Sequence, residues 1–101
     1  MLKNSKQFSK ARTVAHQHEI NKYILRKNDI SENFIEMIDN ALEANEIAKI
    51  CLLKTCTLTV AEVALALERQ LSAQVIQKIG RTILIYRESK SNKTFTKLIN
   101  G

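Results

Sequence analysis

Apolar residues recur every three or four positions in three stretches of the chain, which is the spacing of one face of an α-helix. This pattern predicts helices over residues 5–17, 31–43 and about 57–71. The apolar positions are Phe8, Ala11, Val14 and Ala15 in the first helix, Phe34, Ile35, Ile38 and Leu42 in the second, and Ala61, Ala64, Leu65 and Leu67 in the third. We therefore expect each helix to bury one side.

Short apolar runs lie between and after these helices. Residues 23–25 and 47–53 predict two buried strands. Residues 74–79 and 82–87 predict a hairpin, because only Gly80-Arg81 separates them and a glycine that opens a two-residue loop favours a type II′ turn. The order α-β-α-β-α-β-β predicts a single α/β domain in which a mixed sheet of about four strands packs with helices.

Two of the predicted helices begin beside candidate N-caps. Asp29, with Glu32 three residues later, fits a capping box, and Ser31 is a competing N-cap for the second helix. Thr57 and Thr59 are both candidates for the third helix. Both helix starts are thereby placed to within two residues.

No domain boundary is visible inside the chain, which has no proline and only two glycines. We expect one domain over residues 1–88. The polar and basic stretch Lys90-Ser91-Asn92-Lys93 predicts that residues 89–101 form a mobile tail.

The chain is basic, with a formal net charge of +6, and its charges are segregated. Residues 1–30 hold seven Lys or Arg against two acids, residues 31–68 two against seven, and residues 69–101 seven against one. A basic protein of this size favours nucleic acid or an anionic membrane surface as its partner. The blocks suggest that the two ends of the chain build one cationic face.

Nothing in the sequence resembles a membrane span or an export signal. No apolar run approaches the roughly 20 residues that a spanning helix needs, and the basic residues 1–6 do not precede an apolar signal stretch. We expect a cytoplasmic protein without a membrane partner.

Candidate catalytic and metal-binding residues are few. His16, His18, Cys51 and Cys56 do not have the spacing of a structural zinc site, and the two cysteines are interpreted as reduced thiols in or near the core. There is no glycine-rich phosphate loop. We expect no enzymatic activity, cofactor, metal or small-molecule substrate, with a small nuclease that uses His16 or His18 as general base as the alternative.

The best candidate binding segment is Arg26-Lys27-Asn28-Asp29, which lies before a helix N-terminus whose free N–H groups favour anions. With five aromatic residues and no tryptophan, the chain has few platforms for stacking single-stranded bases, so folded RNA is the expected partner. Further candidate contacts come from the two basic blocks: Lys6, Lys10 and Arg12 from the first, and Lys78, Arg81 and Arg87 from the last.

Four further segments stand out: Ala15-His16, residues 30–33, residues 41–50 and residues 75–88, the last being the most specific. Together they resemble the CRM domain (chloroplast RNA splicing and ribosome maturation) and its stand-alone bacterial YhbY-like members. The resemblance implies an α-β-α-β-α-β-β fold like that of the carboxy-terminal domain of bacterial initiation factor three. It also implies a non-catalytic protein that binds ribosomal RNA of large-subunit precursors during ribosome assembly. We expect this protein to be a monomer.

The chain departs from this family at one motif. The family carries a Gly-x-x-Gly turn after the first strand, where this chain has Arg26-Lys27-Asn28-Asp29. Two readings follow: RNA binding has moved to side chains and the neighbouring basic faces, or the domain has weakened RNA affinity and works as a protein-interaction module. The two basic blocks favour the first.

Overall fold

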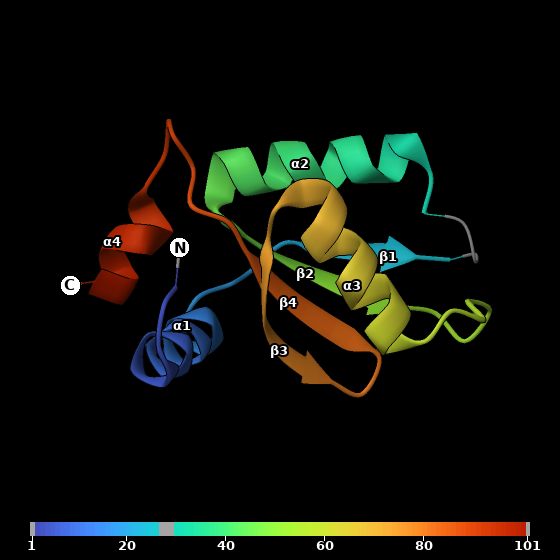
Figure 1. Ribbon diagram of the computed structural model, residues 1–101, viewed down its shortest axis with the longest axis horizontal. Helices are drawn as coiled ribbons and strands as arrows, with labels where there is room; N and C mark the ends of the chain where they lie inside the picture. Colours follow the sequence, from blue (N-terminus) through green and yellow to red (C-terminus); the bar gives the residue numbers. More distant parts are fainter. Residues whose placement is uncertain (1, 27–29, 101) are drawn as a thin grey trace.

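The computed structural model describes residues 2–26 and 30–100 as a four-stranded sheet with helices on both sides (Figure 1). The predicted order of elements is confirmed through residue 86, and one helix follows it. The helices are α1 (Ser5–Gln17), α2 (Glu32–Asn45), α3 (Val60–Leu71) and α4 (Thr94–Asn100), and the strands are β1 (Lys22–Leu25), β2 (Ile47–Leu52), β3 (Gln74–Ile79) and β4 (Thr82–Tyr86).

The sheet is mixed, with the strand order β1-β2-β4-β3. Strand β1 runs parallel to β2, whereas β4 is antiparallel to both β2 and β3. Gly80 has a φ of +56°, and Arg81 is not among the residues with positive φ, which is the pattern of the predicted type II′ turn. The hairpin therefore brings the end of β3 and the start of β4 beside the end of β2.

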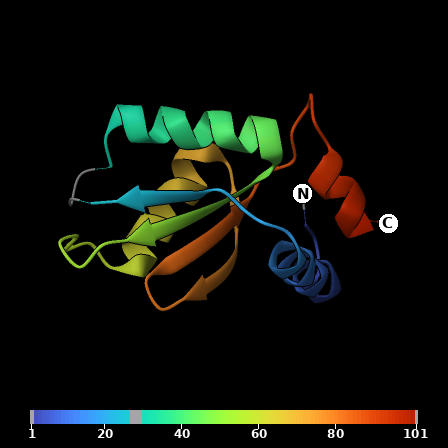
Figure 2. The same ribbon diagram turned by 180° about the vertical axis from the view of Figure 1, so that it is seen from behind.

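The sheet separates two apolar clusters. On one side, α2 and α3 cover it with residues such as Ile38 and Leu67, which pack against Ile50 and Ile83. On the other side, α1 and α4 contribute a second cluster that includes Val14, Ala15, Phe95 and Ile99 and rests on Ile47, Leu84 and Tyr86. Both sides of the sheet are thus used as core, but only the first is covered along the whole sheet (Figure 2).

The competing caps are resolved in favour of the later residue in both cases. Ser31 caps α2 by accepting from the Phe34 amide at 3.1 Å. Thr59 caps α3 in a capping box with Glu62, whose carboxylate accepts from the Thr59 amide at 3.0 Å. This hydrogen bond lowers the pKa of Glu62. Asp29, the other candidate for α2, lies outside the described residues.

The structure differs from the expected mobile tail after residue 88. Residues 94–100 form α4, whose Phe95 and Ile99 are buried in the second cluster with α1. Ser89, although polar, is 1% exposed. The polar run at residues 90–93 is a connection to this helix, and the apolar residues beyond it supply the burial that orders the segment.

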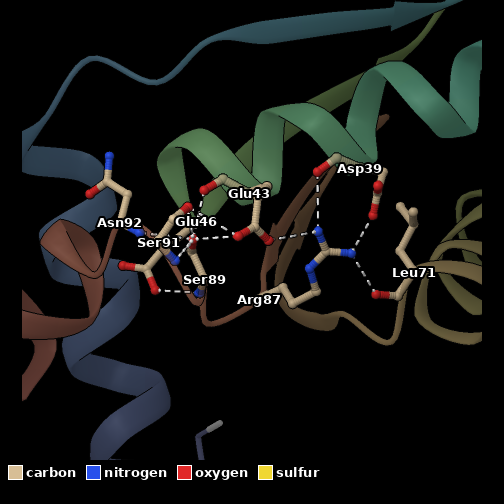
Figure 3. Close-up of polar contacts among 8 residues, drawn as sticks. All are labelled: Asp39, Glu43, Glu46, Leu71, Arg87, Ser89, Ser91 and Asn92. Atoms are coloured by element: carbon tan, nitrogen blue, oxygen red, sulfur yellow. Dashed lines mark hydrogen bonds and ion pairs between the residues drawn. The ribbon is translucent and has the colours of Figure 1, made fainter.

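A buried carboxylate holds this segment in place. Glu46 ends α2 in the left-handed conformation, with a φ of 66°, and its side chain is completely buried. One of its oxygens accepts from the Ser89 amide at 2.7 Å (Figure 3). The carboxylate also accepts from the Thr96 amide at 2.8 Å and from the Thr96 hydroxyl. We call Glu46, Ser89 and Thr96 the C-terminal clasp. It joins the end of α2 to a segment more than forty residues later in the chain.

Candidate nucleic-acid interface

One side of the sheet is only partly covered by helices. Strand alternation and register place Lys22 and Ile24 of β1 beside Lys49 and Cys51 of β2, on the side opposite α2 and α3. Helices α1 and α4 pack at one end of this side and leave the rest uncovered (Figure 2). We call the uncovered part the open face, and it consists of Lys22, Ile24, Lys49, Cys51, Gln77, Ile79 and Thr82.

The open face continues into a cluster of exposed cations at the end of the sheet. Arg26 follows β1, Lys54 follows β2, and Lys78 and Arg81 lie at the hairpin of β3 and β4. Lys78 is paired with Ile83, so it borders the side of the sheet that α2 and α3 cover. We call these four residues the cationic rim. No Asp or Glu occurs in residues 22–26, 49–58 and 77–82, which contain both the rim and the open face. This part of the described chain therefore carries positive charge without internal compensation.

The rim is held by hydrogen bonds to backbone carbonyls. The Arg81 guanidinium donates to the carbonyl oxygens of Leu52 at 3.1 Å, Leu53 at 2.7 Å and Cys56 at 3.0 Å. The Thr55 hydroxyl donates to the carbonyl oxygen of Arg26. Carbonyl groups carry no net charge, so these bonds fix the loop after β2 without balancing the positive charge of Arg81.

The candidate cations of the first helix do not join this surface. Lys6 and Lys10 are exposed on α1, and Figures 1 and 2 show α1 at the opposite end of the molecule from the tip of β1 and the hairpin turn. Arg12 is half-buried and donates to the carbonyl oxygen of Ile76 at 3.4 Å. The expectation that the first helix, the loop at residue 26 and the hairpin form one surface is therefore wrong in its geometry, because α1 packs at the far end of the same side of the sheet.

Arg87 is used inside the fold. Its guanidinium donates to Asp39 Oδ1 at 2.7 Å, to the Asp39 carbonyl at 3.1 Å and to the Leu71 carbonyl at 3.0 Å (Figure 3). A second carboxylate, that of Glu43, lies 3.8 Å away, and the Arg87 side chain is only 17% exposed. Its charge is balanced, so we leave it out of the candidate interface.

Of the candidate loop, the structure describes Arg26 alone, as an exposed residue. Lys27, Asn28 and Asp29 lie outside the described residues. The candidate interface therefore consists of Arg26, Lys78 and Arg81 from the predicted set, together with residues that sequence reasoning missed.

The missed residues are Lys22, Lys49 and Lys54. Lys49 and Lys54 belong to the block of residues 31–68, whose excess of acids concealed them in a count by segment. The available signal was the alternation within β2, where Lys49 interrupts an apolar run at a position that must share its side of the sheet with Cys51. A charge in a central strand indicates that this side is open to water.

The four candidate metal or nucleophilic side chains are not gathered. His16 Nε2 lies 2.9 Å from Gln77 Oε1 beside the open face, whereas His18 lines a separate hollow near α4. Cys51 is half-exposed and Cys56 is buried, both as free thiols. Among residues 2–26 and 30–100, no group of three or more His, Cys, Asp or Glu side chains is placed to hold a metal ion.

The fold and its charges define a small α/β domain with a partly uncovered, cationic sheet. The sequence model of the CRS1/YhbY (CRM) domain family matches residues 4–87, so the chain belongs to this family, as the resemblance implied. No helix of the described residues is long and apolar enough to cross a membrane.

Two relatives support the assignment to this family. A Bacillus subtilis (strain 168) protein, named "Probable RNA-binding protein YqeI", is 42% identical over 67 residues, which span 66% of this chain and 70% of that protein. The solution structure of hypothetical protein SAV1595 from Staphylococcus aureus, described as a candidate RNA-binding protein, has a TM-score of 0.71 and 34% identity. That match covers 91% of this chain and 95% of the other.

Proposed function

We propose that this protein is a non-catalytic RNA-binding protein whose RNA surface is the open face together with the cationic rim. The observation that carries the proposal is the concentration of six cations and no acid in residues 22–26, 49–58 and 77–82. Phosphate groups of RNA neutralise such a surface and release condensed counterions, which is the main source of affinity in nucleic-acid binding. The names of the two relatives point to the same class of partner.

The side chains on this surface suit folded RNA better than an extended single strand. The open face has no aromatic ring, since Tyr23 packs into the cluster under α2 and α3, and Tyr86 is buried. Contacts are then made by Lys and Arg to phosphates, whose positions are fixed in a folded RNA. We further propose ribosomal RNA in precursors of the large subunit as the target, bound by a monomer in the cytoplasm, on the basis of the resemblance to bacterial YhbY-like proteins.

The test is RNA binding across a salt series with two variants that remove the same charge. Arg26→Ala combined with Lys54→Ala alters the rim, and Lys6→Ala combined with Lys10→Ala alters the far helix. Each lost phosphate contact lowers the slope of log affinity against log salt by about 0.7 to 0.9, so the rim variant should have a slope shallower by about 1.5. The variant of the far helix should keep the slope of the unaltered protein.

Equal slopes for the two variants would remove the rim from the interface. Binding without salt dependence would instead favour the protein-interaction reading. Incubation of the protein with the same RNA should leave the RNA intact on a gel, and cleavage that His16→Ala or His18→Ala abolishes would favour the nuclease reading. Sedimentation of cell extracts should place the protein with large-subunit precursors rather than with mature ribosomes.

A further inference from the structure

A hollow of about 300 Å³ opens on the open face beside the C-terminal end of α1. It is lined by side chains from α1 and from each of the four strands, including His16, Lys22, Lys49, Cys51, Gln77 and Leu84. This volume is at the lower end of the range of about 300 to 1,000 Å³ that is typical of small-ligand pockets. The hollow is therefore large enough for one planar group, such as a nucleobase.

Two ammonium groups on one wall of the hollow lack a counter-charge. Lys22 and Lys49 are direct partners in the parallel pairing of β1 and β2, and neighbouring strands are only about 4.8 Å apart. Neither lysine forms an ion pair within the described part of the chain, and no carboxylate lines the hollow. An anionic group between them would relieve their repulsion, which makes a phosphate the complementary ligand.

The other wall carries an oriented amide above an apolar surface. An amide oxygen only accepts hydrogen bonds, so the contact of 2.9 Å between His16 and Gln77 is a bond from His16 Nε2–H to Gln77 Oε1. The amide nitrogen of Gln77 then keeps its two N–H donors, which have no partner among residues 2–26 and 30–100. Beside it, Leu84 and Ile79 supply an apolar surface to the hollow.

We propose that this hollow receives one unpaired nucleotide of the folded RNA, an inference that rests on the proposed RNA-binding function. The phosphate lies between Lys22 and Lys49, the base lies against Leu84 and Ile79, and a base carbonyl accepts from the Gln77 amide. A base within a helix has both faces stacked and cannot enter, so the ligand is a bulged or loop nucleotide. The cationic rim holds the adjoining helical backbone.

Cys51 provides a chemical probe inside the hollow. It is half-exposed on β2, whereas Cys56 is 3% exposed and serves as an internal control for unfolding. The experiment measures alkylation of each cysteine by iodoacetamide, resolved by peptide mass spectrometry. It uses two RNA hairpins that are closed by a non-nucleotide linker in place of a loop and that differ by a single bulged uridine. Each hairpin is supplied at ten times its own measured Kd, so that the two complexes are equally populated.

The bulged hairpin should slow alkylation of Cys51 about tenfold, because free RNA at ten times Kd leaves roughly one protein in eleven unbound. The fully paired hairpin should slow this alkylation far less, because an RNA helix lying over the open face leaves the hollow unfilled and accessible to iodoacetamide. In a parallel binding assay, Gln77→Ala should weaken binding of the bulged hairpin about fivefold, the size expected for one hydrogen bond, and should not change binding of the paired one. Gln70→Ala, an exposed glutamine on α3, is the matched control and should change neither.

Each other outcome overturns a specific statement. Equal protection of Cys51 by both hairpins would mean that bound RNA merely covers the hollow, and no protection by the bound bulged hairpin would mean that its RNA lies elsewhere. Either result rejects the nucleotide site and leaves RNA binding standing. Failure of both hairpins to bind at any salt concentration would reject the proposed function itself.

Discussion

The two ends of the sheet differ in whether their charged side chains have partners of opposite charge or hydrogen-bond donors. At the end near α4, Arg87 is paired with Asp39 and lies within 3.8 Å of Glu43, and the Glu46 carboxylate is buried among three donors of Ser89 and Thr96. At the other end, residues 22–26, 49–58 and 77–82, the described segments that carry the cationic rim, contain no carboxylate. Charges at the first end hold the fold together, and charges at the second remain available to a ligand. The number of basic residues therefore says less about binding than whether each is compensated.

The largest expected change in the free energy of unfolding comes from altering the C-terminal clasp. Glu46→Gln replaces one accepting oxygen by an N–H₂ group that faces donors, so a buried amide or hydroxyl loses its partner. We expect the free energy of unfolding to fall by about 2 to 3 kcal/mol, because hydrogen bonds to a charged buried group are among the strong ones. Urea unfolding measures this change. Glu36→Gln on the exposed side of α2 is the control, and an equal midpoint for both variants would contradict the role of the clasp.

A smaller loss is expected when the geometry of Arg87 is changed but its charge is kept. Arg87→Lys loses the fork that reaches Asp39 and the Leu71 carbonyl together, and should reduce the free energy of unfolding by about 1 to 2 kcal/mol. RNA affinity should be unchanged, because this guanidinium lies outside the interface. Urea unfolding and the salt series measure the two quantities. A loss of RNA affinity at full folding would return Arg87 to the binding surface.

Variants at the two ends of the sheet should also differ in how the free energy of unfolding depends on pH. Hydrogen bonds from Ser89 and Ser91, with a smaller contribution from the Arg87 charge, lower the pKa of Glu43 in the folded protein. The unfolded chain then binds more protons near the ordinary Glu pKa of about 4.3, so the contribution of Glu43 is complete above this pH and is lost as the pH falls through the lower folded value. Glu43→Gln should flatten the acid limb of the stability curve. Lys54→Ala should leave that limb unchanged.

The smallest effect on stability is expected at the rim. Arg26→Ala with Lys54→Ala removes exposed side chains, so the free energy of unfolding should change by no more than about 0.5 kcal/mol, while RNA affinity falls. Thermal or urea unfolding of the variant used for RNA binding measures this. A decrease of more than about 1 kcal/mol in the free energy of unfolding would mean that the rim, like the clasp, stabilises the fold.

Most of the fold followed from local patterns. The helices, the strands and the hairpin at Gly80-Arg81 are encoded by periodicity and turn chemistry within a few residues, and the structure confirms them. Helix α4 was missed because its order depends on distant partners: Phe95 packs with Tyr86, and Thr96 bonds to Glu46. The local sequence, a polar run followed by a short apolar one, would look the same with or without a distant buried carboxylate to bond it.

The candidate site was predicted less completely for a related reason. Whether a cation is compensated is a property of tertiary structure, so sequence could not separate Arg81, which bonds to three carbonyls, from Arg87, which faces two carboxylates. Lys22 and Lys49 come together only through the pairing of β1 with β2. Sequence predicted a cationic surface, and the pairing of the strands determines which cations lie beside one another.

The C-terminal clasp also shows that the folded unit extends beyond the residues that the family's sequence pattern matches. The family's sequence pattern ends at residue 87, yet Tyr86 is covered by Phe95, and its hydroxyl lies 2.6 Å from that of Thr96. A recombinant fragment cut at the boundary of the pattern would leave the Glu46 carboxylate without its donors and open an apolar surface beside α1. Such a fragment is expected to be prone to proteolysis and aggregation. The unit that folds is therefore longer than the unit that the family's sequence pattern spans.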